Sequence, residues 1–585
     1  MIGEPARRAK VDHVYGVVVH TPSRARSSSN QKDRLIAGFA LHKEGRIEEA
    51  EVAYAAYLVD HPTDPAALNN AAVLALQSGN IELAISRLEK LVSVTPTRAH
   101  PHNNLGYAFL RAGRLSEAIG QLQLAIEIDP TYAVAYNNLG MAYESDERRS
   151  DAILAFEKSL DLQPGYADAA ANLGEVLNRD DETGRARAAL RQALASQPDH
   201  LAARVALAAT DALDGSLKDA RARLEALAPS RPRYSRFWQV LASMRDWEGD
   251  FDAARVAYEQ ALALDPSDPL AKFGVSSSLL ASGDYLHGWR AFEERREGFY
   301  GAQSRLSEFA LWDGAHLDGT LLVYCEKGLG DVVQFARFIP QMRARVHRLI
   351  FLADAPWQGL EPLLASLPGI DRIYTDRSDL QRDQPIARAS VLSLPYMLDI
   401  NAAALPGVEI PYLSAPADRK KLWSSRLGTL PRPRVGFAWA AAARRDVRYL
   451  TRQKSIPIAK LRGLLRTPGI SFVSLQMGRP DDLAQLGDVA TQITDFTQDI
   501  RDFGDTAAIL SELDLVVSTD TSVAHVAGAM GKPVWLVDRF NTCWRWRLAE
   551  DSSPWYPTLR IFRQRQFADW SDPLARVAAE LAKLR

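Results

Sequence analysis

The first half of the chain repeats itself every 34 residues. One register is made of prolines, and successive members are 34 positions apart: Pro62, Pro96, Pro130, Pro164, Pro198, Pro232 and Pro266. Alanines keep the same spacing in a second register: Ala50, Ala84, Ala118, Ala152, Ala186, Ala220 and Ala254. A fixed period of this length is typical of stacked repeats and excludes a single mixed core for this half.

Each repeat reads as two amphipathic helices joined by a short turn and closed by a proline, as in HNNLGYAFLRAGRLSEAIGQLQLAIEIDP. Proline lacks an N–H and clashes with the preceding turn, so it ends the second helix. Period and pattern resemble the tetratricopeptide repeat. This resemblance implies an α-solenoid of about eight repeats over residues 34–300, with a concave groove suited to binding another protein.

Asparagines recur with the same period within the array, at Asn70, Asn104, Asn138 and Asn172. A primary amide both donates and accepts hydrogen bonds, so a row of them could hold an extended polypeptide whatever its sequence. The alternative is that they fix contacts between helices. The array resembles that of the O-GlcNAc transferases, in which a similar ladder grips protein substrates, and this implies an acceptor groove here.

After residue 300 the period disappears and strands alternate with helices. GTLLVYCEKGLGDVVQFARFIPQM predicts a strand, a glycine loop and a helix, and the rhythm restarts at RVGFAWA. Alternating strands and helices predict parallel sheets. We expect two successive Rossmann-like α/β domains, 301–415 and 416–585, with ligands at the carboxyl ends of their strands.

Three loops at such strand ends could carry chemistry. The first holds Gly328, Gly330 and Asp331, and its glycines allow backbone with positive φ. Asp331 has two interpretations, as the N-cap of the following helix or as a general base facing a cleft between the domains.

The second loop, Thr519-Asp520-Thr521-Ser522, follows an apolar strand and leads into a helix of mostly small residues. Free N–H groups and the helix dipole make such a start an anion site, to which Thr521 and Ser522 add hydroxyl donors. His525, one turn later, could reach the anion, steady Asp520 or simply fill the core.

The third loop gathers cations, among them Arg444, Arg445 and Lys454, between a strand and a helix. It is either a solvated basic loop or the partner of an anion held at Thr521 and Ser522. Together the loops favour a nucleotide phosphate as ligand.

These elements, in this order, resemble the heptosyltransferase-like glycosyltransferases of family 9, which have the GT-B fold. The likeness rests on GLGD, on Lys454-Ser455-Ile456-Pro457 and on DTSVAHVAGAMGKPVW. It implies an inverting, metal-independent transferase with Asp331 as catalytic base and the 416–585 domain binding the donor. The donor-phosphate residues it implies are Gly328, Gly330, Lys454, Asp520, Thr521, Ser522 and His525.

With tetratricopeptide repeats joined to such a domain, the whole architecture of this chain resembles that of flagellin O-glycosyltransferases. That resemblance implies a flagellin-like protein acceptor and a CMP- or NDP-linked sugar, such as a nonulosonic acid, as co-substrate with no other cofactor. Ala440-Ala441-Ala442 replaces the Ser-Gly-Asn of related fusions, which predicts a donor other than ADP-heptose or weak activity. Competing hypotheses are transfer to a glycan or lipid acceptor and a non-catalytic scaffold or chaperone.

Composition bounds the remaining possibilities. The net charge of −2 argues against a general nucleic-acid binder, and two cysteines indicate neither a disulfide framework nor a zinc site. Residues 1–33, rich in Ser and Arg, predict a disordered tail, and VYGVVV is too short for a signal peptide. No apolar run is long enough to span a membrane, so we expect a cytoplasmic protein.

Overall fold

The computed structural model describes residues 29–295, 306–401, 409–441, 448–548 and 550–584. The chain forms two compact units, Met1–Thr210 and Asp211–Arg585. Of the predicted tail, residues 1–28 lie outside the described residues, and 29–33 begin the first helix. The boundary between the units falls inside the predicted array, within the first helix of its sixth helix pair.

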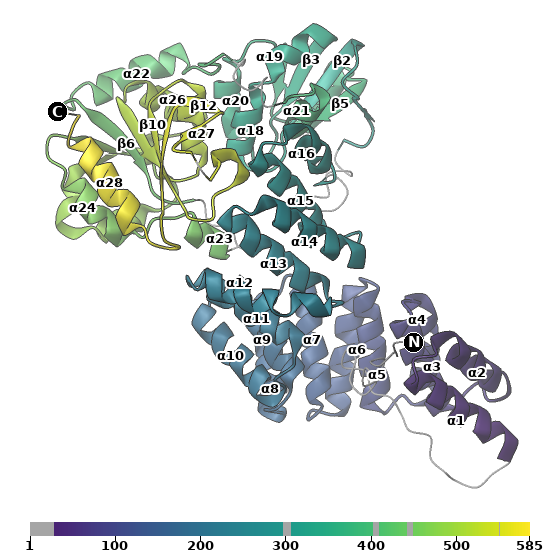
Figure 1. The fold of residues 1–585 in the computed structure, drawn as a ribbon. Helices are drawn as coiled ribbons and strands as arrows, with labels where there is room; N and C mark the ends of the chain where they lie inside the picture. The colour runs from purple at the N-terminus through teal and green to yellow at the C-terminus, as the bar shows by residue number, and fades with distance from the viewer. Residues whose placement is uncertain (1–28, 296–305, 402–408, 442–447, 549, 585) are drawn as a thin grey trace, which may run out of the picture. The chain divides into compact units, whose positions relative to one another are not determined.

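The first unit is a stack of helix pairs (Figure 1). Its helices are α1 (Ser29–Lys43), α2 (Ile47–Asp60), α3 (Pro65–Gln77), α4 (Ile81–Val94), α5 (Ala99–Arg111), α6 (Leu115–Ile128), α7 (Ala133–Ser145), α8 (Arg149–Leu162), α9 (Ala167–Arg179), α10 (Thr183–Ser196) and most of α11 (Leu201–Leu213). Gly79 and Gly113 turn the chain between paired helices with φ of 80° and 74°. Small residues bring the pairs together, because a Cβ on Gly106 would lie 2.6 Å from the Leu122 side chain. The predicted α-solenoid is confirmed.

The second unit begins with further repeat helices. They are α12 (Leu217–Glu225), the pair of α13 (Ser235–Glu248) and α14 (Phe251–Leu264), and the pair of α15 (Pro269–Ser282) and α16 (Tyr285–Phe292). The last of these helices pack against the α/β region. Leu280, Trp289 and Phe292 are buried in one hydrophobic core with residues of both sheets of that region. The end of the array is therefore built into the α/β region.

The first sheet has five parallel strands in the order β1-β5-β2-β3-β4. Their bounds are β1 (Ala310–Leu311), β2 (Leu317–Tyr324), β3 (Val346–Leu352), β4 (Arg372–Tyr374) and β5 (Ala387–Ser390). The order reverses between β2 and β5, which pair up to Tyr324 and Ser390. The glycine loop after β2 thus leaves the sheet at the reversal, where α/β sheets bind ligands.

The second sheet has seven strands in the order β11-β12-β10-β9-β6-β7-β8. They are β6 (Arg434–Ala438), β7 (Ser471–Ser474), β8 (Ile493–Asp495), β9 (Leu515–Ser518), β10 (Val534–Asp538), β11 (Ser552–Ser553) and β12 (Tyr556–Arg563). Apart from the antiparallel edge strand β11, the strands are parallel, in the doubly wound order that reverses between β6 and β9.

Side chains of the second sheet alternate between two cores, as parallel strands covered on both faces require. Leu515 and Val517 of β9 pack with α28 (Ser571–Leu581), whereas Val516 between them packs with α26 (Phe503–Ser511) and α27 (Ser522–Ala529). The parallel sheets with intervening helices predicted for this part of the chain are confirmed, and their division into two domains stays a prediction.

Helix α27 also contacts α18 (Leu329–Ala336), which follows β2 of the first sheet. The connection between the sheets reinforces this contact, because the Tyr412 N–H donates to the Ala529 carbonyl (3.0 Å) and its hydroxyl to the Val333 carbonyl (3.0 Å). The two helices begin at the reversal points of the two sheets. The loops singled out in the sequence therefore come together.

Candidate site at the meeting of two helix starts

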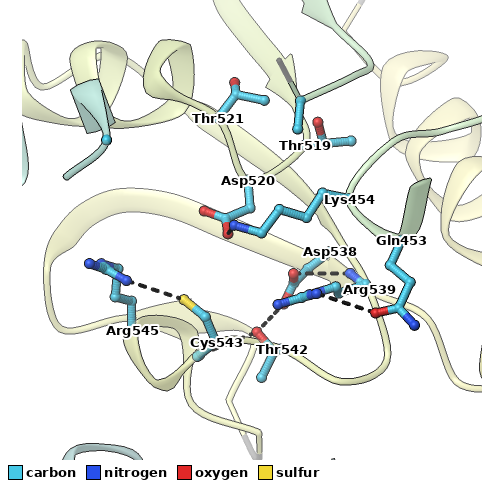
Figure 2. Close-up of polar contacts among 12 residues, drawn as sticks. Gln453, Lys454, Thr519, Asp520, Thr521, Asp538, Arg539, Thr542, Cys543 and Arg545 are labelled. Atoms are coloured by element: carbon cyan, nitrogen blue, oxygen red, sulfur yellow. Dashed lines mark hydrogen bonds and ion pairs between the residues drawn. The ribbon is translucent and has the colours of Figure 1, made fainter. Parts of the chain in front are cut away.

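Five charged or titratable side chains converge where α18 and α27 begin. We call them the charged cluster: Asp331, Lys454, Asp520, His525 and Arg545. The sequence predicted the first four, and Arg545 is an addition from the loop after β10. Figure 2 shows the Lys454 side chain extended to the Asp520 carboxylate and the Arg545 guanidinium directed at the Cys543 sulfur.

The start of α18 differs from the N-cap interpretation of Asp331, while its role as a general base stays a prediction. The helix begins at Leu329 with Gly328 as its N-cap, so Asp331 is its third residue and not the cap. Gly328 has a φ of −80°, and the positive φ expected of the glycines belongs instead to Lys327, at 64°. Gly330 serves close approach, because a Cβ there would lie 2.7 Å from Cδ2 of His525.

Both carboxylate oxygens of Asp331 are engaged. Oδ2 accepts the Gly328 N–H at 3.1 Å, and Oδ1 forms an ion pair with Nη2 of Arg545. Burial by itself would raise the pKa of Asp331, but Arg545 and Lys327 outweigh it and hold that pKa below its ordinary value. The side chain is still 24% exposed, so a substrate atom could reach it.

Lys454 and Asp520 form the second ion pair of the cluster, with Nζ 2.8 Å from Oδ2. Burial would raise the pKa of Asp520, yet the Lys454 ammonium and the His525 ring keep it well below its usual value. The Lys454 side chain is 31% exposed, whereas that of Asp520 is 9% exposed. The cation is thus the more exposed partner of the pair, and the buried carboxylate holds it in place.

His525 is a supporting residue in the core of the site. Its Nδ1 lies 3.0 Å from the Tyr556 hydroxyl, and its Nε2 lies 3.8 Å from Oδ1 of Asp520. Burial lowers its pKa, which favours the neutral ring at pH 7. Of the three roles considered for it, the contacts fit a buried residue that steadies Asp520.

The start of α27 has the properties of an anion site. The helix begins at Ser522 with Thr521 as N-cap, and no acidic residue lies in its first turn. Hydroxyl groups surround this start: Thr521 Oγ1 lies 3.0 Å from Ser518 Oγ, and Thr519 Oγ1 is buried. Within the part of the chain that the structure describes, that Thr519 oxygen has no hydrogen-bond partner.

Backbone N–H groups of the loop after β6 already donate hydrogen bonds to side chains of the protein. The N–H groups of Trp439 and Ala440 donate to Oε1 of Gln476 (3.0 and 2.7 Å), and that of Ala441 donates to Ser455 Oγ (3.2 Å). Ala442 and the predicted cations Arg444 and Arg445 lie outside the described residues. Among the described cations, Lys454 is the member of this basic loop that enters the cluster.

Arg545 was missed in the sequence because no motif marks it. It lies in the short helix η11 (Trp544–Trp546), where its guanidinium carbon is 4.4 Å from the centre of the Trp544 ring. The only local signal is the pattern Trp-Arg-Trp, since flanking aromatic rings are typical of a buried, stacked arginine. Its partners Asp331 and Gln334 are more than 200 residues away in sequence.

The last repeat helices hold the loop that precedes Asp331. Arg295, at the end of the array, donates to both oxygens of Glu326 at 3.0 and 3.1 Å. Next to Glu326, the Lys327 ammonium lies 4.7 and 4.8 Å from the ring centres of Phe273 and Phe292. Burial lowers the pKa of Lys327 to about 8. The repeat array thus supplies one wall of this part of the site.

The asparagine ladder is buried and bonds to itself. Asn70, Asn104 and Asn138 have no exposed surface, and Asn172 is half-buried. Amides of successive repeats donate to one another at 2.9 Å: Asn172 to Asn137, Asn138 to Asn103 and Asn104 to Asn69. Neighbours within each repeat complete the chain of bonds. These contacts fit the alternative in which the asparagines fix helix packing, while a grip on a polypeptide stays a prediction.

Solved structures of other repeat proteins match short parts of the chain. The crystal structure of MamA is 28% identical, covers 28% of this chain and 94% of its own, and has a TM-score of 0.25. A thermophilic TPR protein of Thermus thermophilus is 25% identical and covers 31% of this chain and 98% of its own, with a TM-score of 0.28.

Comparisons of the sequence with known proteins identify the repeats. Protein FlbA of Caulobacter vibrioides is 29% identical over 367 residues, which make up 57% of this chain and 59% of that protein. No helix within the described ranges combines the length and apolarity needed to cross a membrane. Tetratricopeptide-repeat profiles match residues 38–92, 69–133 and 248–286, residues 177–244, and residues 133–166. On these profile matches, the N-terminal region of the chain consists of tetratricopeptide repeats.

Proposed function

We propose that this chain is a cytoplasmic protein O-glycosyltransferase with a GT-B catalytic region, which transfers a sugar from a CMP- or NDP-linked donor to a Ser or Thr of a flagellin-like protein. One observation carries the proposal. The reversal points of two doubly wound sheets lie together, with a carboxylate on one side and a helix start, two hydroxyls and a lysine on the other.

The phosphate of the donor fits the start of α27. Helix N–H groups, the hydroxyls of Thr521 and Ser522, and the ammonium of Lys454 are donors suited to phosphate oxygens. Charge that develops on the leaving phosphate would be stabilised there by donors already in place, which is the most effective form of electrostatic catalysis.

Asp331 is the group placed to take a proton. The acceptor hydroxyl would attack the anomeric carbon, its proton passing to the Asp331 carboxylate as the new oxygen–carbon bond forms. The bond from that carbon to the phosphate oxygen breaks on the opposite face, and its electron pair leaves with the phosphate. This displacement inverts the configuration of the sugar.

The repeat array is the proposed receptor for the acceptor protein. Tetratricopeptide arrays present extended surfaces for protein binding. Here the last helices share a core with the sheets and hold the loop before Asp331 through Arg295, Phe273 and Phe292. Acceptor binding on the array would thus be joined to the chemistry through packed side chains.

The test begins with nucleotide binding. Thermal shift and calorimetry with CMP, UDP, ADP and GDP should reveal one nucleotide that stabilises the protein. Intact mass of flagellin co-expressed with this chain and a nucleotide-sugar pathway should then show an added sugar. Asp331→Asn should abolish that addition and leave the nucleotide bound.

Each alternative has its own outcome. No response to any nucleotide would overturn the transferase and favour a scaffold. Nucleotide binding with modification of a glycan or lipid, and none of flagellin, would favour the heptosyltransferase-like alternative. Removal of residues 1–210, which leaves the second compact unit whole, should abolish flagellin modification and spare nucleotide binding.

A further inference from the structure

The two cations of the charged cluster both have carboxylate partners. Lys454 pairs with Asp520 on the same side of the site, next to the start of α27. Arg545 pairs with Asp331, which belongs to the other sheet's helix. The first pair therefore lies within the proposed phosphate site, whereas the second joins that site to the proposed base.

Arg545 is directed toward both sides of the cluster. Nη2 bonds to Asp331, while Nη1 lies 3.8 Å from the Cys543 sulfur, and Asp520 acts on the same guanidinium electrostatically. Its side chain is 13% exposed, which leaves part of it open to a ligand. A guanidinium binds phosphate with two parallel hydrogen bonds, so it is a strong phosphate ligand.

The Asp331 pair conflicts with base catalysis. A carboxylate stabilised by an arginine at contact distance binds a proton weakly, and Asp331 has its pKa held down in this way. General bases work best when their pKa lies near the working pH. Loss of the Arg545 contact would move the pKa of Asp331 upward, because Arg545 is the strongest of the groups that lower it.

We propose that Arg545 is an exchangeable phosphate ligand: the leaving-group phosphate of the donor draws Arg545 away from Asp331, and this exchange frees Asp331 to act as base. The inference rests on the proposed function. It assigns to Arg545 a role in coupling, so that the base is released only when a donor occupies the site. The exchange therefore controls when the acceptor hydroxyl is activated: Asp331 can take its proton only after the donor phosphate has bound.

The exchange predicts an unusual effect on affinity. Asp331 competes with phosphate for Arg545, so Asp331→Asn should tighten binding of the nucleotide found in the panel of CMP, UDP, ADP and GDP by about threefold to tenfold. Arg545→Gln, which keeps a hydrogen-bonding side chain beside Gln334, should weaken the same binding by about tenfold or more.

A double-mutant cycle separates exchange from simple charge removal. Deleting any negative charge near an anion site raises affinity, and that effect would persist in an Arg545→Gln background. Under exchange, the gain from Asp331→Asn disappears in Arg545→Gln and persists in the matched Lys454→Gln background. Kd values of the full-length variants by calorimetry give the result directly.

The outcomes distinguish the two proposals. Nucleotide binding without tightening in Asp331→Asn, or with equal tightening in the Arg545→Gln background, overturns the exchange and leaves the transferase standing. No nucleotide binding by the wild type overturns both. Far-UV circular dichroism verifies folding, and Asp331→Ser provides a second variant should Asp331→Asn fail to fold.

Discussion

Gly330 of α18 and His525 of α27 lie in direct contact, so that a Cβ on the glycine would come within 2.7 Å of Cδ2 of the imidazole. The imidazole cannot retreat easily, because Tyr556 holds its Nδ1 at 3.0 Å and its ring lies 5.3 Å from that of Trp546. The absence of one side chain therefore allows the two helix starts to meet, and with them Asp331 and Asp520.

Gly330→Ala tests this contact. We expect overpacking to lower the free energy of unfolding by about 1–3 kcal/mol and to weaken nucleotide binding, since His525 supports Asp520. Chemical denaturation and calorimetry measure the two effects. The control is Gly463→Ala, where a Cβ meets no atom within 4 Å. Equal behaviour of the two variants would contradict the prediction.

Lys454→Gln should weaken nucleotide binding by about tenfold to a hundredfold, because it removes the partly exposed cation beside the start of α27. The loss should shrink as salt rises, since charge interactions near the surface are screened. Isothermal calorimetry at two salt concentrations checks both statements. Lys460→Gln, whose exposed amine bonds to the Ser571 hydroxyl, is the matched control. An effect of the same size at Lys460 would exclude a specific role for Lys454.

Asn104→Ala should destabilise the first unit by about 1–3 kcal/mol, because it removes buried hydrogen bonds with Asn69 and Asn103. Hydrogen exchange of the full chain should show lost protection in α3 and α5. Gln123→Ala, an exposed amide that bonds to Tyr143, should change protection little. If Asn104→Ala instead weakened acceptor binding with protection intact, the ladder would be a peptide site after all.

Periodicity made the fold readable from the sequence. Prolines and alanines at fixed intervals marked the repeat helices, and buried strands such as Leu515–Ser518 were recognisable as apolar runs. The extent of the last repeats was less readable. Leu280 and Trp289 look like ordinary repeat residues, yet they pack against sheets formed by distant segments.

The candidate site was readable only where a loop's own residues define it. Thr521 and Ser522 predict a helix start within four residues of a strand, and in the structure they are the N-cap and first residue of α27. Arg545 could not be found in this way, since its importance comes from Asp331 across more than 200 residues. The asparagines have a clear sequence signal, but their strict period is explained equally well by packing between repeats and by binding of a polypeptide.

Trp289→Ala should uncouple the end of the array from the site. The Trp289 ring lies 5.7 Å from that of Phe335 in α18 and 5.5 Å from that of Trp544, the neighbour of Arg545. Removing a buried tryptophan costs about 3–5 kcal/mol, so we expect a lower unfolding midpoint and weaker nucleotide binding. Leu286→Ala on the same helix removes an exposed side chain and serves as control. Unchanged nucleotide binding in a destabilised Trp289→Ala protein would refute the coupling.

The Lys327 amine predicts a pH dependence of stability. Burial lowers its pKa from 10.5 to about 8 in the folded protein, so between these values the unfolded chain holds a proton that the folded chain has released. Stability rises with pH wherever the unfolded state binds more protons. The contribution of Lys327 should therefore increase from about pH 8 to about pH 10.5, by at most about 1.4 kcal/mol per pH unit.

Urea unfolding of the wild type and of Lys327→Met over this range isolates that contribution, because other lysines and tyrosines titrate alike in both proteins. The wild type should gain stability relative to the variant as pH rises above about 8, since the neutral amine no longer carries the cost of a charge buried away from water. Loss of that charge also removes a cation that stabilises the Asp331 carboxylate, so transfer should respond to pH near 8 in the wild type and lose this response in Lys327→Met. A constant difference in stability across the range would show that the amine is solvated and does not act on Asp331.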